Sequence, residues 1–162
     1  MSISSDSNWT SVIVNGNPEE WLPVMKFAIS GLSIGISKHG AWLVGSSNEC
    51  VPVDSGTATR ILPILEMDPG LSKAQLINAI MNQAISPASL QGGIELPFLI
   101  AVQAAIEGNS EYWADLALDW LGTLTPSPEI LESLEGLVNA RWASQRTRHR
   151  AHRILHGRHS SQ

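Results

Sequence analysis

The stretch Ile61-Leu62-Pro63-Ile64-Leu65 has two counterparts in the chain, Trp21-Leu22-Pro23-Val24-Met25 and Glu95-Leu96-Pro97-Phe98-Leu99. Each has a Leu-Pro pair followed by two apolar residues, and the prolines lie 40 and 34 residues apart. Such a period is typical of repeats built from pairs of helices. A proline near the start of a helix costs little, because the N–H that it lacks has no partner there. These stretches predict an all-α fold, a right-handed α-solenoid of about three helix pairs, with a generic helical bundle as the alternative.

Helix signals divide the chain in the same way. Asn17-Pro18-Glu19-Glu20 provides a capping residue, a proline for the first turn and acids near the positive end of the helix dipole. We expect an irregular segment over 1–16, in which Val12-Ile13-Val14 is a candidate short strand, and a single helical domain over 17–157. Residues 31–54 are expected to be a long connection, and 158–162 a tail. The expected helices cover residues 17–30, 54–66, 72–85, 95–107, 109–121, 129–139 and 143–155.

Several of these stretches resemble one protein family. Ala58-Thr59-Arg60-Ile61-Leu62-Pro63-Ile64-Leu65 resembles the AxxxVPFL helix start of small bacterial HEAT-like repeat proteins, and Leu96-Pro97-Phe98-Leu99 is similar to the same pattern. His39-Gly40 resembles the HxG that often precedes it, and residues 145–155 are similar to the family's final helix. The resemblance implies a HEAT-like solenoid that binds a protein without catalysis. Small proteins of this kind often occur among immunity proteins, which neutralise toxins.

Length and composition point to a single soluble domain. The chain has 162 residues, of which 43% are apolar and 15% charged. This argues against disorder, and no apolar run is long enough for a membrane span. Met1 to Trp9 has neither a basic start nor an apolar run, so we expect no signal peptide. The single cysteine, Cys50, fits a reducing compartment. These features predict a cytoplasmic protein without a membrane partner.

Charge is distributed very unevenly along the chain. Residues 1–140 hold all 15 acids and four bases, a net charge of −11, whereas residues 141–162 hold six arginines and no acid. The protein is therefore expected to have an acidic body and a basic last segment. An acidic body favours cationic partners and repels nucleic acid.

The strongest candidate for a binding surface is a ladder of acids spaced four residues apart. Its members are Glu107, Glu111, Asp115 and Asp119, and no lysine or arginine lies between Lys73 and Arg141. Like charges at this spacing destabilise a helix by about 0.2–0.5 kcal/mol per pair. Either the basic last helix packs across the ladder, or the ladder binds a cationic partner such as a basic toxin. Trp42, in the expected connection, is a candidate interface anchor, with core filling as the alternative.

The basic segment gives a second candidate surface. Arg146, Arg148, Arg150 and Arg153 could pair with nucleic-acid phosphates. They have almost no interleaved aromatic residue, so nucleic acid is the less favoured partner. His149, His152, His156 and His159 are spaced for one helix face, but the arginines among them disfavour a metal ion. We predict neither a metal site nor a cofactor.

Catalytic motifs are missing from the sequence. Cys50 and His39 are the one candidate for a nucleophile and its base, without a third residue to orient them. We therefore expect a protein-binding chain that is not an enzyme, and the specific hypothesis is an immunity protein that neutralises a cognate toxin. The alternatives are an adaptor or regulatory scaffold, and a nucleic-acid-associated domain that uses the last helix.

Overall fold

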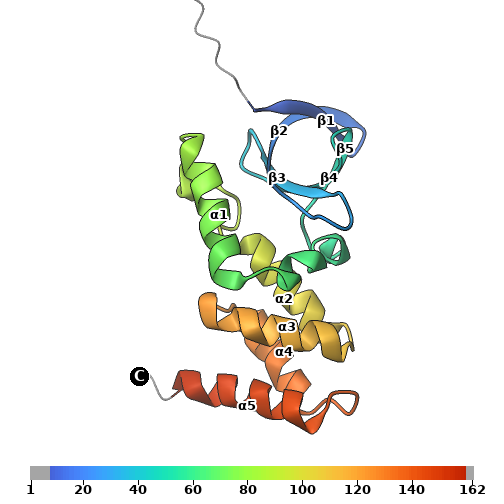
Figure 1. Ribbon diagram of the computed structural model, residues 1–162, viewed down its shortest axis with the longest axis vertical. Coiled ribbons are helices and arrows are strands. Elements are labelled where there is room, and N and C mark those ends of the chain that lie inside the picture. The colour runs from blue at the N-terminus through green and yellow to red at the C-terminus, as the bar shows by residue number, and fades with distance from the viewer. Residues whose placement is uncertain (1–7, 160–162) are drawn as a thin grey trace, which may run out of the picture.

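The structure is a computed structural model that describes residues 8–159, and its N-terminal part is a closed β-barrel (Figure 1). Successive strands pair antiparallel, and the first and fifth pair in parallel to close the ring. The prediction of an all-α solenoid is therefore wrong, and so is the resemblance to HEAT-like repeat proteins. The strands are β1 (Thr10–Val14), β2 (Asn17–Lys26), β3 (Ser33–Ser37), β4 (Trp42–Gly45) and β5 (Glu49–Pro52).

Helices follow the barrel and stack beneath it in Figure 1. No helix in residues 8–159 is both long and apolar enough to cross a membrane. The α-helices are α1 (Pro69–Asn82), α2 (Leu96–Glu107), α3 (Glu111–Trp120), α4 (Pro128–Val138) and α5 (Gln145–His159). The short 3₁₀ helices are η1 (Ala58–Arg60), η2 (Leu62–Glu66), η3 (Pro87–Ser89) and η4 (Leu121–Thr123).

The three Leu-Pro stretches do not form a repeat. Pro23 lies in β2, Pro63 in the 3₁₀ helix η2, and Pro97 in the first turn of α2. A helix over 17–30 would have placed Pro23 in its interior, at a cost of about 3 kcal/mol. In β2 the pairing with β3 instead shifts register between Pro23 and Met25. An irregularity of this kind tolerates a missing N–H.

A tight turn starts the barrel. Asn15 and Gly16 have φ angles of 50° and 82°, and they join β1 to β2 with Val14 opposite Asn17. Asn-Gly is the strongest short-range signal for a two-residue hairpin, because both residues tolerate positive φ. The short strand expected at Val12-Ile13-Val14 is confirmed within β1, whereas the helix expected from residue 17 is replaced by β2.

The barrel interior is filled by one large side chain. Trp21 is 1% exposed and packs in a cluster with four smaller residues, Val12, Val14, Leu43 and Cys50. Gly35 makes room for it: a β-carbon there would lie 2.6 Å from the Trp21 ring and 2.4 Å from the Leu22 carbonyl oxygen. The expected long connection 31–54 thus holds three strands, and each contributes a residue that lies against Trp21: Gly35 of β3, Leu43 of β4 and Cys50 of β5.

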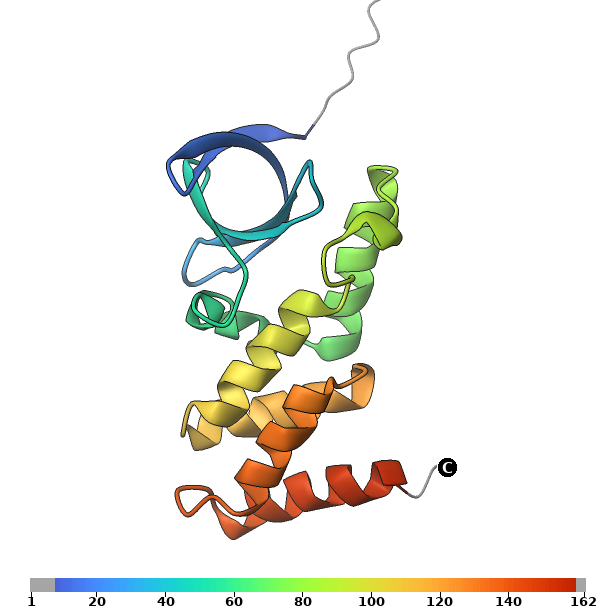
Figure 2. The same ribbon diagram turned by 180° about the vertical axis from the view of Figure 1, so that it is seen from behind.

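The outer faces of β3 and β4 join the barrel to the helices. Ile34, Ile36 and Trp42 are buried and belong to one core with Phe98 and Trp120. The Trp42 Nε1 donates to the Gly93 carbonyl at 3.0 Å, and the Trp120 Nε1 donates to the Leu65 carbonyl at 3.0 Å. Figure 2 shows α2 running from the barrel side of the molecule toward the lower helices.

Local capping signals predicted the later helices well. Ser110 caps α3 by accepting the Trp113 N–H, and Ser127 caps α4 by accepting the Ile130 N–H. The helices expected over 95–107, 109–121 and 129–139 are confirmed to within a few residues. The helix expected over 72–85 begins earlier, at Pro69, because Asp68 is its cap.

Candidate functional site

Helix α5 packs across the acids of α3. The Glu111 carboxylate accepts the Ser144 backbone N–H at 2.8 Å and also the hydroxyls of Ser144 and Thr147. The Thr147 hydroxyl also lies 3.0 Å from Oδ1 of Asp115. Of the two ways to relieve the acid ladder, packing of the last helix is the one present in the structure.

One arginine of α5 neutralises the other two acids of α3, Asp115 and Asp119. The Arg150 Nη1 lies 2.9 Å from Oδ1 of Asp115, and its Nη2 forms an ion pair with Asp119. The Arg150 side chain is only 20% exposed, so this contact is partly shielded from water. We call the contacts of Glu111, Asp115 and Asp119 with α5 the α3–α5 latch.

Hydrogen bonding stabilises the charged form of Glu111. The side chains of Ser144 and Thr147 and the backbone N–H of Ser144 hold the pKa of Glu111 below its ordinary value, and the charge of Arg146 contributes in the same direction. The carboxylate is therefore ionised wherever the latch is formed near neutral pH.

Glu107 stands apart from the other three acids. It ends α2, and a break at Gly108 and Asn109, where Asn109 has a φ of 57°, separates it from α3. Its carboxylate accepts the Gln103 side-chain amide at 3.2 Å and the Ser133 hydroxyl at 2.6 Å. Glu107 thus links α2 to α4, and the four predicted acids do not form one continuous surface.

Trp42 is part of the core. It is 3% exposed, and its indole N–H donates a hydrogen bond to the Gly93 carbonyl. The structure therefore places it away from the acids and away from solvent. Its role in the folded chain is to dock the barrel on the helices.

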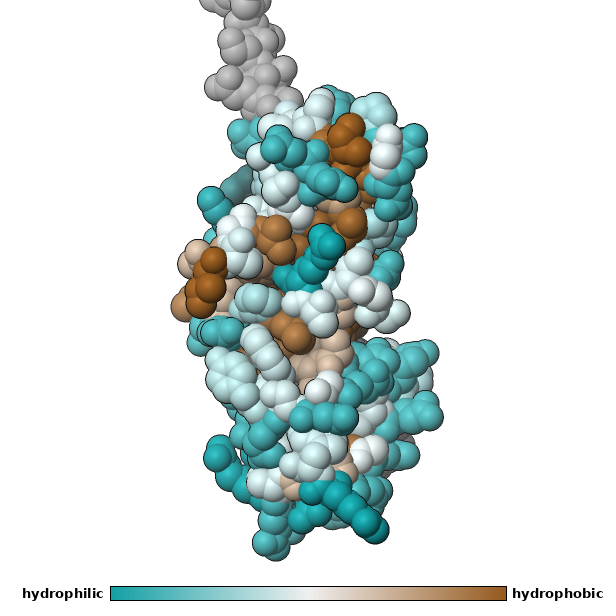
Figure 3. Space-filling view, turned by 90° about the vertical axis from the view of Figure 1, so that its right-hand side faces the viewer, coloured by the Kyte–Doolittle hydropathy of each residue, from teal (hydrophilic) through white to brown (hydrophobic). Residues whose placement is uncertain are grey.

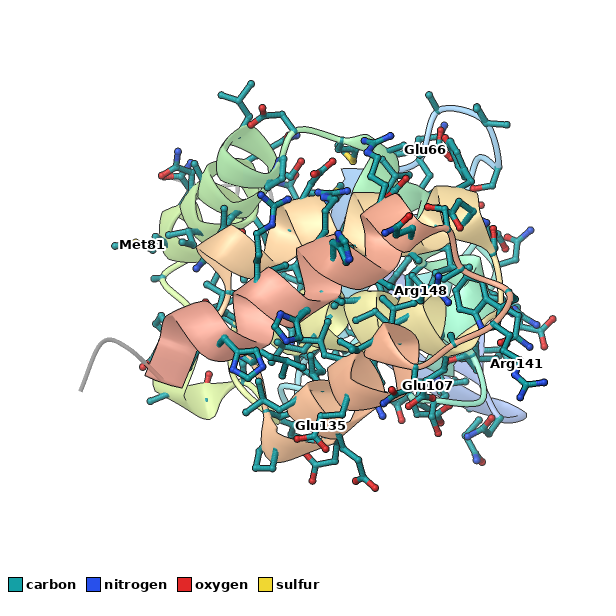
Figure 4. All side chains as sticks on the ribbon, turned by 90° about the horizontal axis from the view of Figure 1, so that it is seen from below. Glu66, Met81, Glu107, Glu135, Arg141 and Arg148 are labelled. Carbon is teal, nitrogen blue, oxygen red and sulfur yellow. The ribbon has the colours of Figure 1, made fainter. Side chains whose placement is uncertain are left out.

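The opposite face of α5 carries exposed basic side chains, which we call the α5 basic face. Arg146, His149, His152 and Arg153 line an open hollow of about 530 Å³. Seen from below, α5 lies in front of the other helices, with Arg148 at its edge and Glu135 farther out on α4 (Figure 4). Among residues 8–157, Arg146, Arg148 and Arg153 form no ion pair with a carboxylate. Three of the four predicted arginines thus face outward or sideways, and Arg150 faces the latch.

The histidines do not assemble a metal site. The rings of His152 and His156 lie 4.1 Å apart between centroids. In the part of the chain that the structure describes, no group of three His, Cys, Asp or Glu side chains is placed to hold a metal ion. The side chain of His159 and residues 160–162 lie outside the described part.

Cys50 and His39 lie in different environments. Cys50 is 1% exposed inside the barrel, and burial, with Glu49 adding to it, raises the pKa of its thiol to about 11. His39 is exposed on the turn between β3 and β4. A thiol that stays protonated inside a barrel is a poor nucleophile.

An apolar pocket was not anticipated from the sequence. It has a volume of about 190 Å³ and lies between the β2–β3 loop (residues 27–32) and η2. Its lining includes Phe27, Ile29, Pro63 and Met67, with Lys26 and Glu66 at its margins. Ile29 is 91% exposed at the tip of the loop. Figure 3 shows hydrophobic side chains gathered at mid-height on this side of the molecule.

Compared with protein-family models, curated proteins and solved structures, the chain shows no significant match. The molecule offers two candidate binding surfaces, the α5 basic face and the apolar pocket.

Proposed function

We propose that this chain is a non-catalytic binding protein and that the α5 basic face is its docking surface for the phosphate backbone of a nucleic acid. The observation that carries the proposal is that Arg146, Arg148 and Arg153 form no ion pair with a carboxylate among residues 8–157. The acids of α3 that could have paired with these arginines, Glu111, Asp115 and Asp119, are held in the α3–α5 latch, and the other acids lie on other elements.

The basic face is costly to the free protein. Arg146 and Arg150 are four residues apart and Arg150 and Arg153 are three apart, and cations at these spacings repel each other on a helix. Arg150 is neutralised by Asp115 and Asp119, and the charge of Arg146 interacts with that of Glu111. Arg148 and Arg153 form no ion pair with a carboxylate among residues 8–157. An anionic partner would remove this repulsion.

The chemistry of the face favours phosphates over a protein surface. Its hollow is lined by arginine and histidine alone, while Ile154 and Leu155 turn partly into the core. Protein interfaces usually centre on apolar anchors. Interfaces with nucleic acid are more polar and more positively charged. A guanidinium also matches a phosphate with two parallel hydrogen bonds.

The position of α5 suits such a partner. It is the outermost helix, at the opposite end of the long axis from the barrel (Figure 1). From Arg146 to Arg153 the helix rises about 10 Å, and an α-helix fits a DNA major groove about 12 Å wide. Approach at this end keeps the acids of the barrel and of η2 away from the phosphates.

The test is a titration of labelled duplex DNA and single-stranded RNA, followed by fluorescence anisotropy at several salt concentrations. About three phosphate contacts predict a slope of log K against log salt near −2.7. The variant Arg146→Gln/Arg153→Gln should flatten this slope by about 2. The control is Arg60→Gln, an exposed arginine on η1, which should leave the slope unchanged. Equal binding by the double variant and the parent would refute the proposal, and full competition by polyglutamate would point to an acidic protein instead.

Protein binding is retained as the second candidate function, because the apolar pocket beside Ile29 has the composition of a protein contact. The hypothesis of a toxin-neutralising protein stays a prediction. Its original support, an exposed acidic ladder, is largely taken up by the α3–α5 latch.

A further inference from the structure

The β2–β3 loop holds an apolar side chain outward in a defined conformation. The Gly31 N–H donates to the Phe27 carbonyl at 2.9 Å, and the Phe27 N–H donates to the Leu32 carbonyl at 2.8 Å. Gly31 has a φ of 71°, which closes the turn. Ile29 at its tip is thus presented to solvent by a hydrogen-bonded turn.

The pocket beside this side chain can accept one of similar size. Its volume is about 190 Å³, and its surface is formed mainly by Phe27, Pro63 and Met67 together with Ile29 itself. An apolar cavity of about 150 Å³ takes up benzene. An isoleucine side chain therefore fits the available space.

Two opposite charges lie at the margins of the same pocket. Lys26 is at the end of β2 and Glu66 at the end of η2. Among residues 8–157 they form no ion pair with each other or with another side chain, and the Glu66 carboxylate shares a hydrogen bond with the Tyr112 hydroxyl. In a two-fold interface, a contact between one residue of the first copy and another residue of the second copy is always repeated with the two copies exchanged. Lys26 of each copy would then lie against Glu66 of the other.

We propose that this face binds a second copy of the chain, with Ile29 of each copy inserted into the pocket of the other and Lys26 paired with Glu66 across the interface. Ile29, the pocket, Lys26 and Glu66 lie on one face of the molecule. One two-fold arrangement of two copies can therefore form all of the proposed contacts at once. The patch is smaller than the roughly 1,600 Å² of a standard interface, so the dimer is weak and dissociates at low protein concentration. The proposal is independent of the α5 basic face.

Sedimentation velocity across a range of protein concentrations tests this dimer. The parent should shift from monomer to dimer as concentration rises. Ile29→Asp should raise the dissociation constant at least tenfold. The matched control is Leu71→Asp, which changes another exposed apolar residue, 73% exposed on α1, and should leave dimerisation intact.

Charge exchange gives a sharper test. Lys26→Glu and Glu66→Lys should each weaken the dimer several-fold, because each places like charges across the axis. The double variant should recover most of the lost affinity. Circular dichroism checks that each variant is folded. A parent that stays monomeric throughout the concentration range, or a double variant no better than the single ones, would overturn the proposal. So would a dimer unaffected by Ile29→Asp.

Discussion

Arg150 of α5 and Asp115 of α3 form an ion pair with 2.9 Å between Nη1 and Oδ1, although 35 residues separate them in the sequence. The same guanidinium reaches Asp119 through its other terminal nitrogen. One side chain thus neutralises two acids that would otherwise repel each other along α3.

Removal of these two acids should destabilise the fold. Asp115→Asn/Asp119→Asn leaves Arg150 partly buried without its charge partners, at an expected cost of about 1–2 kcal/mol. This corresponds to a fall in melting temperature of about 2–8 °C, measurable by circular dichroism. Glu129→Gln/Glu132→Gln is the matched control, because it removes two exposed acids of α4 that form no ion pair with residues 8–157. An increase in stability of the α3 variant would mean that repulsion between the acids outweighs their contact with Arg150.

Glu111 should make the stability depend on pH in the acid range. Its pKa is lowered from the ordinary value of 4.5, chiefly by hydrogen bonds from Ser144 and Thr147. The unfolded chain therefore takes up the proton first, and the stabilisation present above pH 4.5 is lost as the pH falls through the lower folded pKa. Urea midpoints measured over this range should fall less steeply for Glu111→Gln than for the parent. Parallel pH profiles for the two proteins would contradict the role given to this carboxylate.

The thiol of Cys50 should be nearly inert in the native state. With a pKa of about 11 in place of 9.0, its thiolate fraction at pH 8 falls by about a hundredfold, and burial limits access further. Alkylation by iodoacetamide should be slower by at least this factor in buffer than in concentrated urea. Mass spectrometry of timed samples measures both rates. Comparable rates in the two conditions would place Cys50 outside a closed barrel.

Two glycines should respond to alanine in opposite ways. Gly35→Ala forces a β-carbon to within 2.4 Å of the Leu22 carbonyl oxygen and should cost about 3 kcal/mol. Gly136, inside α4, has nothing within 4 Å of the added carbon. Gly136→Ala should therefore stabilise the protein by about 0.5–1 kcal/mol. Urea unfolding of both variants checks the signs, and a neutral Gly35→Ala would show that the barrel can expand around Trp21.

Local signals explain which elements the sequence could predict. Helices α3 and α4 begin at Ser110 and Ser127, whose side chains cap them within three residues of sequence. The barrel depends on pairing between strands, and only its Asn15-Gly16 turn has a comparably local signal. The helix expected over 17–30 conflicted with the position of Pro23 in its interior, where a proline breaks the hydrogen bonding of a helix.

The residues of the candidate site could be predicted from the sequence, but the contacts between them could not. The acids of α3 and the arginines of α5 both stood out by spacing and charge. Their contacts join residues more than 30 positions apart, and periodicity alone does not determine which faces meet. Trp42 likewise looked like a loop aromatic, because strand β4, which begins at Trp42, was not recognised.

The parallel contact between β1 and β5 leaves the barrel without a free edge. Unpaired strand edges are where foreign strands add and where β-rich chains aggregate. This closing seam consists of two residue pairs, Ile13 with Glu49 and Val14 with Cys50, whereas β2 and β3 share a far longer pairing. This short pairing is therefore what protects the barrel from polymerisation. If it were lost, the closed barrel would become an open sheet with two unpaired edge strands, to which other strands could add.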